Sequence, residues 1–337
     1  MIRLLLAFLT IPLLALADSR PRLLILTDIG GDPDDQQSLV RLLVYANEFQ
    51  IEGLVATSAG VPGQLKTPAT RPDLIRTTVA AYGEVLPHLE RHAPGWPSAN
   101  ALLGTVKTGN PLRGRDYIGE NHDTEASRWI VSRADVGDPD HPLNIAVWGG
   151  QTDLAQALWR VKQDRGEAGL RNFTRLLRVY DVDDQDGLAG GIASAYHGIN
   201  YILSSAASGE DKRRAAYRGM YLGGDESLTG RDWIDKNIRS RGPLGALYPV
   251  KTWTAPNPHN CLKEGDTPSW FFFLPLGGND PLDPSKPGWG GEYRRDADGI
   301  YRDAVTQPGG DPRETVNRWR PAFQADFARR MTWCLPK

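Results

Sequence analysis

Short runs in which almost every residue is apolar recur along the chain. Runs of this kind predict strands that are buried on both faces of a sheet. Longer segments between them place apolar residues three or four positions apart, which predicts helices. The alternation of the two patterns predicts an α/β fold with a mostly parallel central sheet flanked by helices. The predicted strands cover residues 22–27, 51–57, 143–148, 176–180 and 201–204, and the predicted helices cover residues 34–46, 72–89, 124–133, 152–163 and 313–331.

Two polar stretches rich in glycine and proline, residues 208–257 and 277–310, interrupt this alternation. We expect them to be long insertions over the ligand end of the sheet. The apolar run at residues 270–274 is compatible with a strand or with a turn of helix. Since no stretch has the composition of a linker, we expect residues 18–337 to form a single domain.

The first residues have the pattern of an export signal. Arg3 precedes an apolar run that ends in Ala15-Leu16-Ala17. We expect a signal peptide over residues 1–17 and a periplasmic or secreted protein with no membrane attachment after cleavage; an uncleaved anchor is the alternative. In an oxidising compartment Cys261 and Cys334, the two cysteines of the sequence, are expected to form a disulfide, and two separate buried thiols are the alternative.

The charge balance argues against one class of partner. The 337 residues include 39 Lys and Arg and 41 Asp and Glu, which gives a net charge of −2. A nearly neutral chain lacks the broad positive field that attracts nucleic acid polymers or anionic membranes. We therefore expect neither of them as a partner.

The clearest chemical signal is an acidic loop between the first predicted strand and the first predicted helix. Asp28, Asp32, Asp34 and Asp35 fall within eight residues of one another. Ligands of parallel sheets bind beyond the carboxyl ends of the strands, where this loop must lie. Crowded carboxylates repel one another unless a cation neutralises them, and oxygen ligands on an irregular loop favour Ca²⁺. The alternative is a solvated turn in which Asp34 caps the helix.

The sequence resembles a known family at this loop and at a second segment. The run T-D-I-G-G-D-P-D-D at residues 27–35 looks like the N-terminal signature of the calcium-dependent nucleoside hydrolases. Residues 147–155 are similar to the strand-G-P-L-T-N-L-A segment of that family. Further stretches resemble one branch, the nucleoside-hydrolase-like domain of exported cellulose-binding-type proteins, and the resemblance covers about residues 21–334. These stretches are residues 92–97, 178–180, 185–186, 242–249, 263–269 and 288–291.

The resemblance implies a calcium site and assigns its ligands. Asp28 matches the carboxylate that binds calcium and takes the proton from the attacking water, and Asp35 matches the bidentate ligand. Thr152 matches the residue that offers its backbone carbonyl. The last ligand is expected at Asp266, with Asp280 as the alternative.

The resemblance also implies a substrate side of the site. Asp34 matches the residue that holds a sugar hydroxyl. We expect Gln185 and Asp186, which follow the fourth strand, to contact sugar hydroxyls as well, unless they only begin a helix. Glu125 is a further candidate for a sugar contact, and Trp148 is expected to line the pocket.

The nucleobase side of the family pattern is altered. Leu26 replaces an Asp found in many relatives, and Gly265 stands where a His helps to protonate the leaving base; His197 and His259 are candidate substitutes. We therefore expect a calcium-dependent hydrolase of a small nucleoside-like or other glycosidic substrate, with homo-oligomers as in relatives. A non-catalytic binding protein for cellulose or plant oligosaccharide is the alternative. Tryptophans in Gly- and Pro-rich loops, which could stack on sugars, motivate that alternative: Trp96, Trp253 and Trp289.

Overall fold

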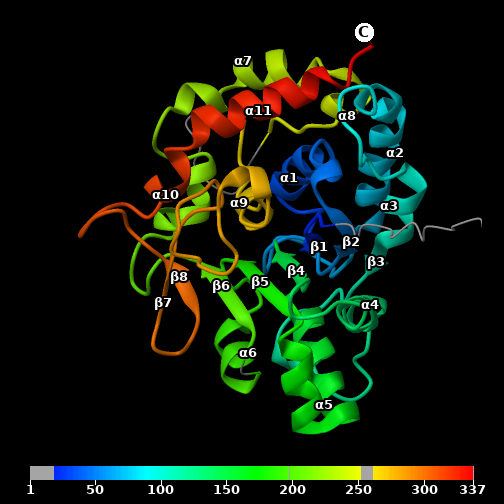
Figure 1. Ribbon diagram of the computed structural model, residues 1–337, viewed down its shortest axis with the longest axis vertical. Coiled ribbons are helices and arrows are strands. Elements are labelled where there is room, and N and C mark those ends of the chain that lie inside the picture. Colours follow the sequence, from blue (N-terminus) through cyan, green and yellow to red (C-terminus); the bar gives the residue numbers. More distant parts are fainter. Residues whose placement is uncertain (1–18, 197, 252–260, 337) are drawn as a thin grey trace, which may run out of the picture.

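The computed structural model describes residues 19–196, 198–251 and 261–336 (Figure 1). The predicted signal peptide, His197, Trp253 and His259 lie outside the described residues. No helix within the described part of the chain combines the length and apolar character needed to cross a membrane.

A single eight-stranded sheet runs through the middle of the described chain, in the order β3-β2-β1-β4-β5-β6-β8-β7. Neighbouring strands are parallel except for the antiparallel pair β7–β8. The predicted α/β fold with a mostly parallel sheet is therefore confirmed. The strands are β1 (Arg22–Thr27), β2 (Gln50–Ala56), β3 (Val106–Thr108), β4 (Leu143–Val147), β5 (Leu177–Val182), β6 (Asn200–Ser204), β7 (Tyr293–Arg295) and β8 (Tyr301–Asp303).

The strand order reverses direction between β1 and β4. From β1 the chain moves to one side to form β2 and β3, and then returns to form β4 on the other side of β1. The loops that follow β1 and β4 therefore diverge at the carboxyl edge of the sheet. In open parallel sheets this reversal leaves a crevice in which ligands bind.

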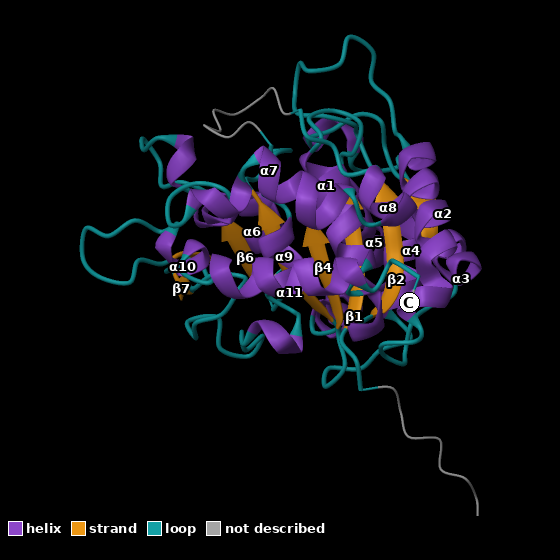
Figure 2. Cartoon of the chain, turned by 90° about the horizontal axis from the view of Figure 1, so that it is seen from above, coloured by secondary structure: helices purple, strands orange, loops and turns teal. Residues whose placement is uncertain are grey.

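Helices cover both faces of the sheet (Figures 1 and 2). One face carries α1 (Asp34–Leu43), α2 (Pro72–Leu89), α8 (Gly242–Ala246), α9 (Thr267–Phe271) and α11 (Arg320–Thr332), and the other carries α4 (Glu125–Ala134), α5 (Gln151–Thr174) and α6 (Ala189–Ala195). The remaining α-helices are α3 (Ala99–Thr105), α7 (Arg231–Ile234) and α10 (Glu314–Asn317). Shorter 3₁₀ or π turns are Ala46–Glu48, Arg115–Tyr117, Lys212–Arg214, Ala216–Met220, Glu226–Thr229, Asp235–Arg239 and Pro275–Gly277.

The central strands explain the apolar runs of the sequence. Leu23 and Ile25 of β1 pack into the core under α1 and α2, whereas Leu24 and Leu26 pack into the core under α4 and α5. All four side chains are fully buried. Burying an aliphatic side chain of this size contributes about 1.5–3 kcal/mol, so each of these four side chains stabilises one of the two cores.

The predicted boundaries of helices and strands are most accurate where the spacing of apolar residues fits only one of the two elements. The strand at residues 22–27 and the helix at residues 72–89 are confirmed as predicted. The run at residues 270–274 forms helical turns rather than a strand. The closing helix is divided into α10 and α11, because Pro321 has no amide hydrogen and starts a new helix at its first turn.

The expected disulfide is not formed. Cys261 and Cys334 are separate free thiols, and both are buried in the core on the α1 side of the sheet. Burial raises the pKa of the Cys334 thiol to about 12. Both side chains therefore act as small apolar core residues, which was the alternative reading of the sequence.

Candidate functional site

A cavity of about 420 Å³ opens at the carboxyl edge of the sheet, where the strand order reverses. Its walls come from loops far apart in sequence. One side, called here the acidic wall, contains Asp28, Asp34, Asp35 and Asp266. A second part of the lining comes from residues 212–221, contains Lys212, Tyr217, Arg218 and Tyr221, and is called here the opposite wall. Further lining residues are Asp32, Gly60, Val61, Pro62, Gln64, Trp148, Val182, Asp183, Gln185 and Lys263.

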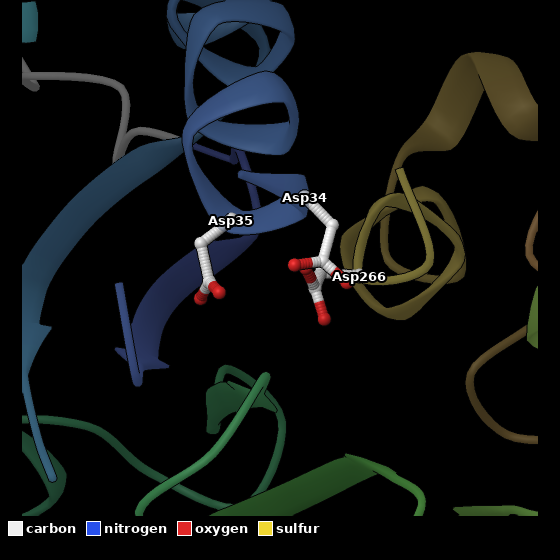
Figure 3. Close-up of side chains that lie close together, drawn as sticks. All are labelled: Asp34, Asp35 and Asp266. Atoms are coloured by element: carbon white, nitrogen blue, oxygen red, sulfur yellow. The ribbon is translucent and has the colours of Figure 1, made fainter. Parts of the chain in front are cut away.

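Three carboxylates of the acidic wall lie close enough to share one metal ion (Figure 3). Asp34 and Asp35 lie in the first turn of α1, and Asp266 directly precedes α9. Each offers an oxygen within 4.8 Å of the oxygens offered by the other two. Asp266 is 3% exposed, and within the described chain its Oδ2 atom is buried without a hydrogen-bond partner. The donor set is therefore all oxygen, and one oxygen still needs a partner, which suits a hard cation such as Ca²⁺ or Mg²⁺.

The electrostatics of the acidic wall favour a positive charge. Burial is the largest cause that raises the pKa of Asp34, Asp35 and Asp266, and neighbouring carboxylates raise it further. Burial likewise raises the pKa of Asp28 to about 7, although the charge of Arg113 opposes this shift. A bound cation opposes these shifts, so the cation and the ionised carboxylates stabilise each other.

Local sequence places Asp28 and Asp35 together. The Thr27 hydroxyl, at the end of β1, donates a hydrogen bond to Asp35 and accepts one from the Ile29 amide at 3.1 Å. On the β4 side, the backbone at Gly149 passes directly over Asp28. A β-carbon at Gly149 would lie 2.7 Å from Asp28 Cγ, so only glycine allows this approach.

A hydrogen-bonded chain connects β4 to Asp266. The indole nitrogen of Trp148 donates to Ser269 Oγ at 2.8 Å, and Ser269 Oγ donates to the backbone carbonyl of Asp266 at 2.5 Å. A buried ion pair lies beneath, with 3.0 Å between Arg41 Nη2 and Glu264 Oε1. Trp148, which was expected to line the pocket, therefore lines the cavity and also helps to position a candidate metal ligand.

The loop after β5 contributes Gln185 to the cavity and holds Asp186 behind it. Gln185 donates from its amide to the backbone carbonyl of Trp148. Asp186 accepts hydrogen bonds from the Thr152 amide at 2.9 Å and the Thr152 hydroxyl at 2.7 Å. Among the described residues that line the cavity, neither Asp186 nor Thr152 is present. The structure thus brings Gln185 to the candidate site and leaves the other two in a supporting layer.

The same loop has an unusual backbone. Asp183, which lines the cavity, and Asp184 have φ angles of 72° and 47°. Residues other than glycine rarely adopt this left-handed backbone conformation, which costs of order 1–3 kcal/mol per residue. Asp184 is held there because its carboxylate accepts from the Leu188 amide at 2.8 Å and the Ala189 amide at 2.9 Å.

Arg113 is a component of the site that the sequence analysis missed. Its Nη2 atom donates to the Ser58 carbonyl at 2.6 Å and lies 3.9 Å from Asp28 Oδ2. Its Nη1 atom lies 3.7 Å from Asp186 Oδ1. One guanidinium therefore connects the loops after β1, β2 and β5. Arg113 follows the short strand β3, which had no recognisable apolar run, so no sequence signal placed it at the carboxyl edge.

The cations of the cavity were also missed. Lys263 is paired with Asp32, lies 4.0 Å from Asp34, and has a pKa lowered by burial to about 8. Arg218 donates to the Tyr221 hydroxyl at 2.6 Å, and its Nε atom is buried with no hydrogen-bond partner among the described residues. The sequence could have indicated Lys263, because it lies in the same family-like stretch, residues 263–269, as Asp266. Arg218 lies in residues 208–257, for which the sequence predicted only an insertion.

Three other expected contacts lie outside the cavity. Glu125 is exposed and accepts from the Thr108 amide at 3.0 Å. Asp280, the alternative last ligand, pairs with Lys286 at 2.7 Å near the surface. Trp289 is only 8% exposed and packs against Phe271, with 5.3 Å between ring centroids. Glu125 thus bonds to a nearby backbone amide, Asp280 forms a surface ion pair, and Trp289 packs in the core.

The strand order, the acidic loop after β1 and the glycine turn after β4 define a nucleoside-hydrolase-like α/β domain. Residues 22–293 match the family model described as "Cellulose-binding Sde182, nucleoside hydrolase-like domain", and the chain belongs to this family. A solved structure of a nucleoside hydrolase-related hypothetical protein from Saccharophagus degradans, described as associated with carbohydrate metabolism, is similar to it. The two share 30% sequence identity with a TM-score of 0.75, over 94% of this chain and 72% of the other. No curated protein matches the sequence.

Proposed function

We propose that this protein is a calcium-dependent glycosidase that hydrolyses an N-glycosidic or related glycosidic bond of a small, sugar-containing substrate. The proposal rests on one observation in the acidic wall: Asp34, Asp35 and Asp266 each offer a carboxylate oxygen, and these oxygens lie within 4.8 Å of one another. The orphan oxygen of Asp266 adds to it, since a buried carboxylate oxygen without a donor is costly unless a cation is bound. Membership of a nucleoside-hydrolase-like family supports the reaction class.

The residues of the acidic wall have separate roles in this proposal. Asp34, Asp35 and Asp266 would hold the ion, together with Asp28 and the Thr152 carbonyl that the family resemblance adds. A bound calcium ion supplies Lewis acidity that lowers the pKa of a nearby water and orients sugar hydroxyls. Asp34, which is partly exposed to the cavity, is also placed to accept a hydrogen bond from the sugar.

Asp28 is the proposed general base. It takes a proton from the attacking water as the water oxygen forms a bond to the anomeric carbon. The glycosidic bond breaks at the same time, and its electron pair leaves with the leaving group. The transition state resembles an oxocarbenium ion, which the neighbouring carboxylates stabilise. Arg113, 3.9 Å from Asp28, fixes the carboxylate in place.

The opposite wall defines the leaving-group side. Among the described residues that line the cavity no histidine is present, and the donors of this wall are Lys212, Tyr217, Arg218 and Tyr221. Burial raises the pKa of Tyr217 and Tyr221, so both phenols remain protonated and able to donate hydrogen bonds. This supports a leaving group that is recognised by hydroxyl and guanidinium donors rather than by a histidine.

Export and a single domain complete the proposal. The apolar run after Arg3 supports a signal peptide at residues 1–17, with the remaining residues forming one domain that acts outside the cytoplasm. A periplasmic or secreted location is consistent with a ligand derived from plant polysaccharide.

The test combines metal binding with turnover. The full chain is titrated with Ca²⁺ by isothermal calorimetry, and nucleosides and plant oligosaccharides are screened for release of reducing sugar. We expect Ca²⁺ binding, together with release that Asp28→Asn lowers about a thousandfold while sugar affinity is largely kept. Asp280→Asn, at a partly exposed position outside the cavity, is the matched control and should leave turnover unchanged. Absence of Ca²⁺ binding would contradict the site itself.

A carbohydrate-binding protein is the second candidate, because the family description contains the words "cellulose-binding". In that case the metal and Asp34 would bind pairs of adjacent sugar hydroxyls without cleaving a bond. The two functions are separated by Asp28→Asn: a binding protein would show sugar affinity without release, and the substitution would weaken that affinity no more than Asp34→Asn does.

A further inference from the structure

A second cavity, of about 660 Å³, lies beside the first at the carboxyl ends of β6 and β8. Ser205 follows β6 and Asp303 ends β8, and both line this second cavity. Val182 and Asp183, which line the first cavity, follow the neighbouring strand β5. The two cavities therefore share the edge of the sheet formed by the neighbouring strands β5, β6 and β8.

One short segment forms the partition between the two cavities. Lys212 and Arg218 line the first cavity, whereas Arg214, between them in sequence, lines the second. The segment is anchored to the strand ends, because the Ala216 amide donates to Asp303 Oδ2 at 2.6 Å and the Tyr217 amide donates to Ser204 Oγ at 3.2 Å. A chain-like ligand that occupied the first cavity would only have to cross this partition to reach the second.

The charged side chains that line the second cavity are paired. Arg214 pairs with Glu210 at 2.9 Å, and Arg302 pairs with Asp296 at 3.2 Å. The exposed Arg294 lies 3.4 Å from Asp296. Since each guanidinium lies close to a carboxylate, the lining presents hydrogen-bond donors and acceptors side by side. A sugar hydroxyl both donates and accepts, so this surface suits a neutral polyhydroxylated ligand.

Asp303 contributes to the second cavity a carboxylate oxygen that is available to a ligand. Its Oδ1 atom is buried and has no hydrogen-bond partner among the described residues, although the residue lines the second cavity. Among the described lining residues no aromatic ring is present, so a sugar would be held by its hydroxyl edges rather than by stacking.

We propose that the second cavity is a binding subsite for a neutral sugar unit of an oligosaccharide whose other end occupies the first cavity. This inference rests on the carbohydrate part of the proposed function and is independent of calcium and of bond cleavage. It explains a structural feature that hydrolysis of a simple nucleoside does not use, namely a larger cavity, lined in part by charged side chains, next to the acidic one.

The test measures affinity as a function of ligand length. Neutral β-1,4-glucan oligosaccharides from the dimer to the hexamer are titrated against the full chain by isothermal calorimetry. Because the second contact becomes intramolecular, we expect the hexamer to bind about tenfold or more tightly than the dimer. Ala207→Trp, which places a bulky ring at an exposed position of the second cavity, should reduce hexamer affinity to the dimer level and leave dimer affinity unchanged.

Two controls separate this inference from its alternatives. Val136→Trp adds the same ring at a position that is 63% exposed and remote from both cavities, and should change neither affinity. Arg294→Ala removes an exposed donor without threatening the fold, and should weaken the hexamer alone. Unchanged melting temperatures confirm that each variant is folded.

The outcomes are distinct from those of the proposed function. Equal affinity for all lengths, no glucan binding, or tighter binding of uronate oligomers than of neutral ones would each overturn the neutral sugar subsite. Hexamer affinity that is lost in Ala207→Trp but kept in Asp35→Ala would support the subsite while contradicting the proposed use of the acidic wall.

Discussion

The two walls of the first cavity are built in different ways. The acidic wall lies at the ends of regular elements: Asp28 follows β1, Asp34 and Asp35 start α1, and Asp266 directly precedes α9. The opposite wall belongs to the short turns Lys212–Arg214 and Ala216–Met220 and to Tyr221, which follows the second turn. Buried ion pairs and hydrogen bonds hold the first wall, whereas the second carries surface pairs such as Arg213–Asp211. The difference suggests that the part of the site that binds metal is fixed by the fold, while the part that selects the ligand is carried by an insertion.

The largest expected effect is on the free energy of unfolding, through the buried ion pair that supports the acidic wall. Arg41 and Glu264 are both fully buried, and Glu264 also accepts from the Thr267 hydroxyl at 2.9 Å. Glu264→Ala leaves the Arg41 charge without its carboxylate and should lower the free energy of unfolding by about 3–5 kcal/mol. Chemical denaturation measures this value. The corresponding substitution in an exposed pair beside the opposite wall, Asp211→Ala, should leave the free energy of unfolding nearly unchanged. Equal costs would remove the distinction between the walls.

The next effect concerns the metal. Asp266→Asn keeps the shape of the side chain but removes one of three converging negative charges, and should weaken Ca²⁺ binding about a hundredfold in calorimetry. Asp280→Asn, at the alternative ligand position, should leave Ca²⁺ affinity unchanged. If the two substitutions had similar effects, the last ligand would have been assigned to the wrong aspartate.

A smaller effect is expected on the opposite wall. Arg218→Met preserves much of the length of the side chain while removing the donor next to Tyr221, and should weaken ligand binding about tenfold without changing Ca²⁺ affinity. Arg213→Met changes an exposed residue of the same segment that pairs with Asp211, and serves as the control. A parallel loss of Ca²⁺ affinity in Arg218→Met would show that the walls are not separable.

The smallest effect is a pH dependence of stability in the support of the opposite wall. Burial is the main cause that raises the pKa of Asp303 from 3.8 to about 7, with a further increase from Asp183, whereas hydrogen bonds from Ala216 and Ser204 lower it. Because the folded state holds this proton more tightly than the unfolded chain, the stability it contributes is full below pH 3.8 and is lost as the pH rises through about 7.

Asp303→Asn should remove this dependence. At pH 8 we expect the variant to melt at a higher temperature than the wild type, and the difference should shrink as the pH falls and disappear near pH 4. Asp211→Asn is the control, because hydrogen bonds from Arg213 lower the pKa of Asp211 to about 2 and reverse the sign. A gain that persisted unchanged at pH 4 would point to a cause other than this titration.

The sequence predicted the sheet and the acidic wall well because both depend on local patterns. Fully apolar strands such as β1 are recognisable by themselves, and Asp28 through Asp35 are adjacent in sequence. Asp266 required the family resemblance, because no local pattern relates it to the loop after β1. Thr152 as a carbonyl ligand stays a prediction, since its amide and hydroxyl are the groups whose contacts the structure shows.

The opposite wall and the connecting network could not be predicted in the same way. Arg113 is placed by β3, a strand of three residues that is too short to produce an apolar signal. Arg218 lies in a 3₁₀ turn and Tyr221 directly follows it, and the positions of such turns are set by tertiary contacts rather than by periodicity. Glu125 was misplaced because an acidic residue at the first turn of a helix is favoured there for local reasons, whether or not a ligand is near.

The left-handed backbone of Asp183 and Asp184 has a consequence for the entropy of binding. A loop that retains two strained residues in succession is held in one conformation by its surroundings, chiefly the two amides at the start of α6. The conformational entropy of this part of the cavity is therefore lost when the chain folds and not when a ligand arrives. Substituting glycine for Asp184, which does not line the cavity, would relax the strain but would also allow the free loop more conformations, so that affinity would fall even though no contact with the ligand had been removed.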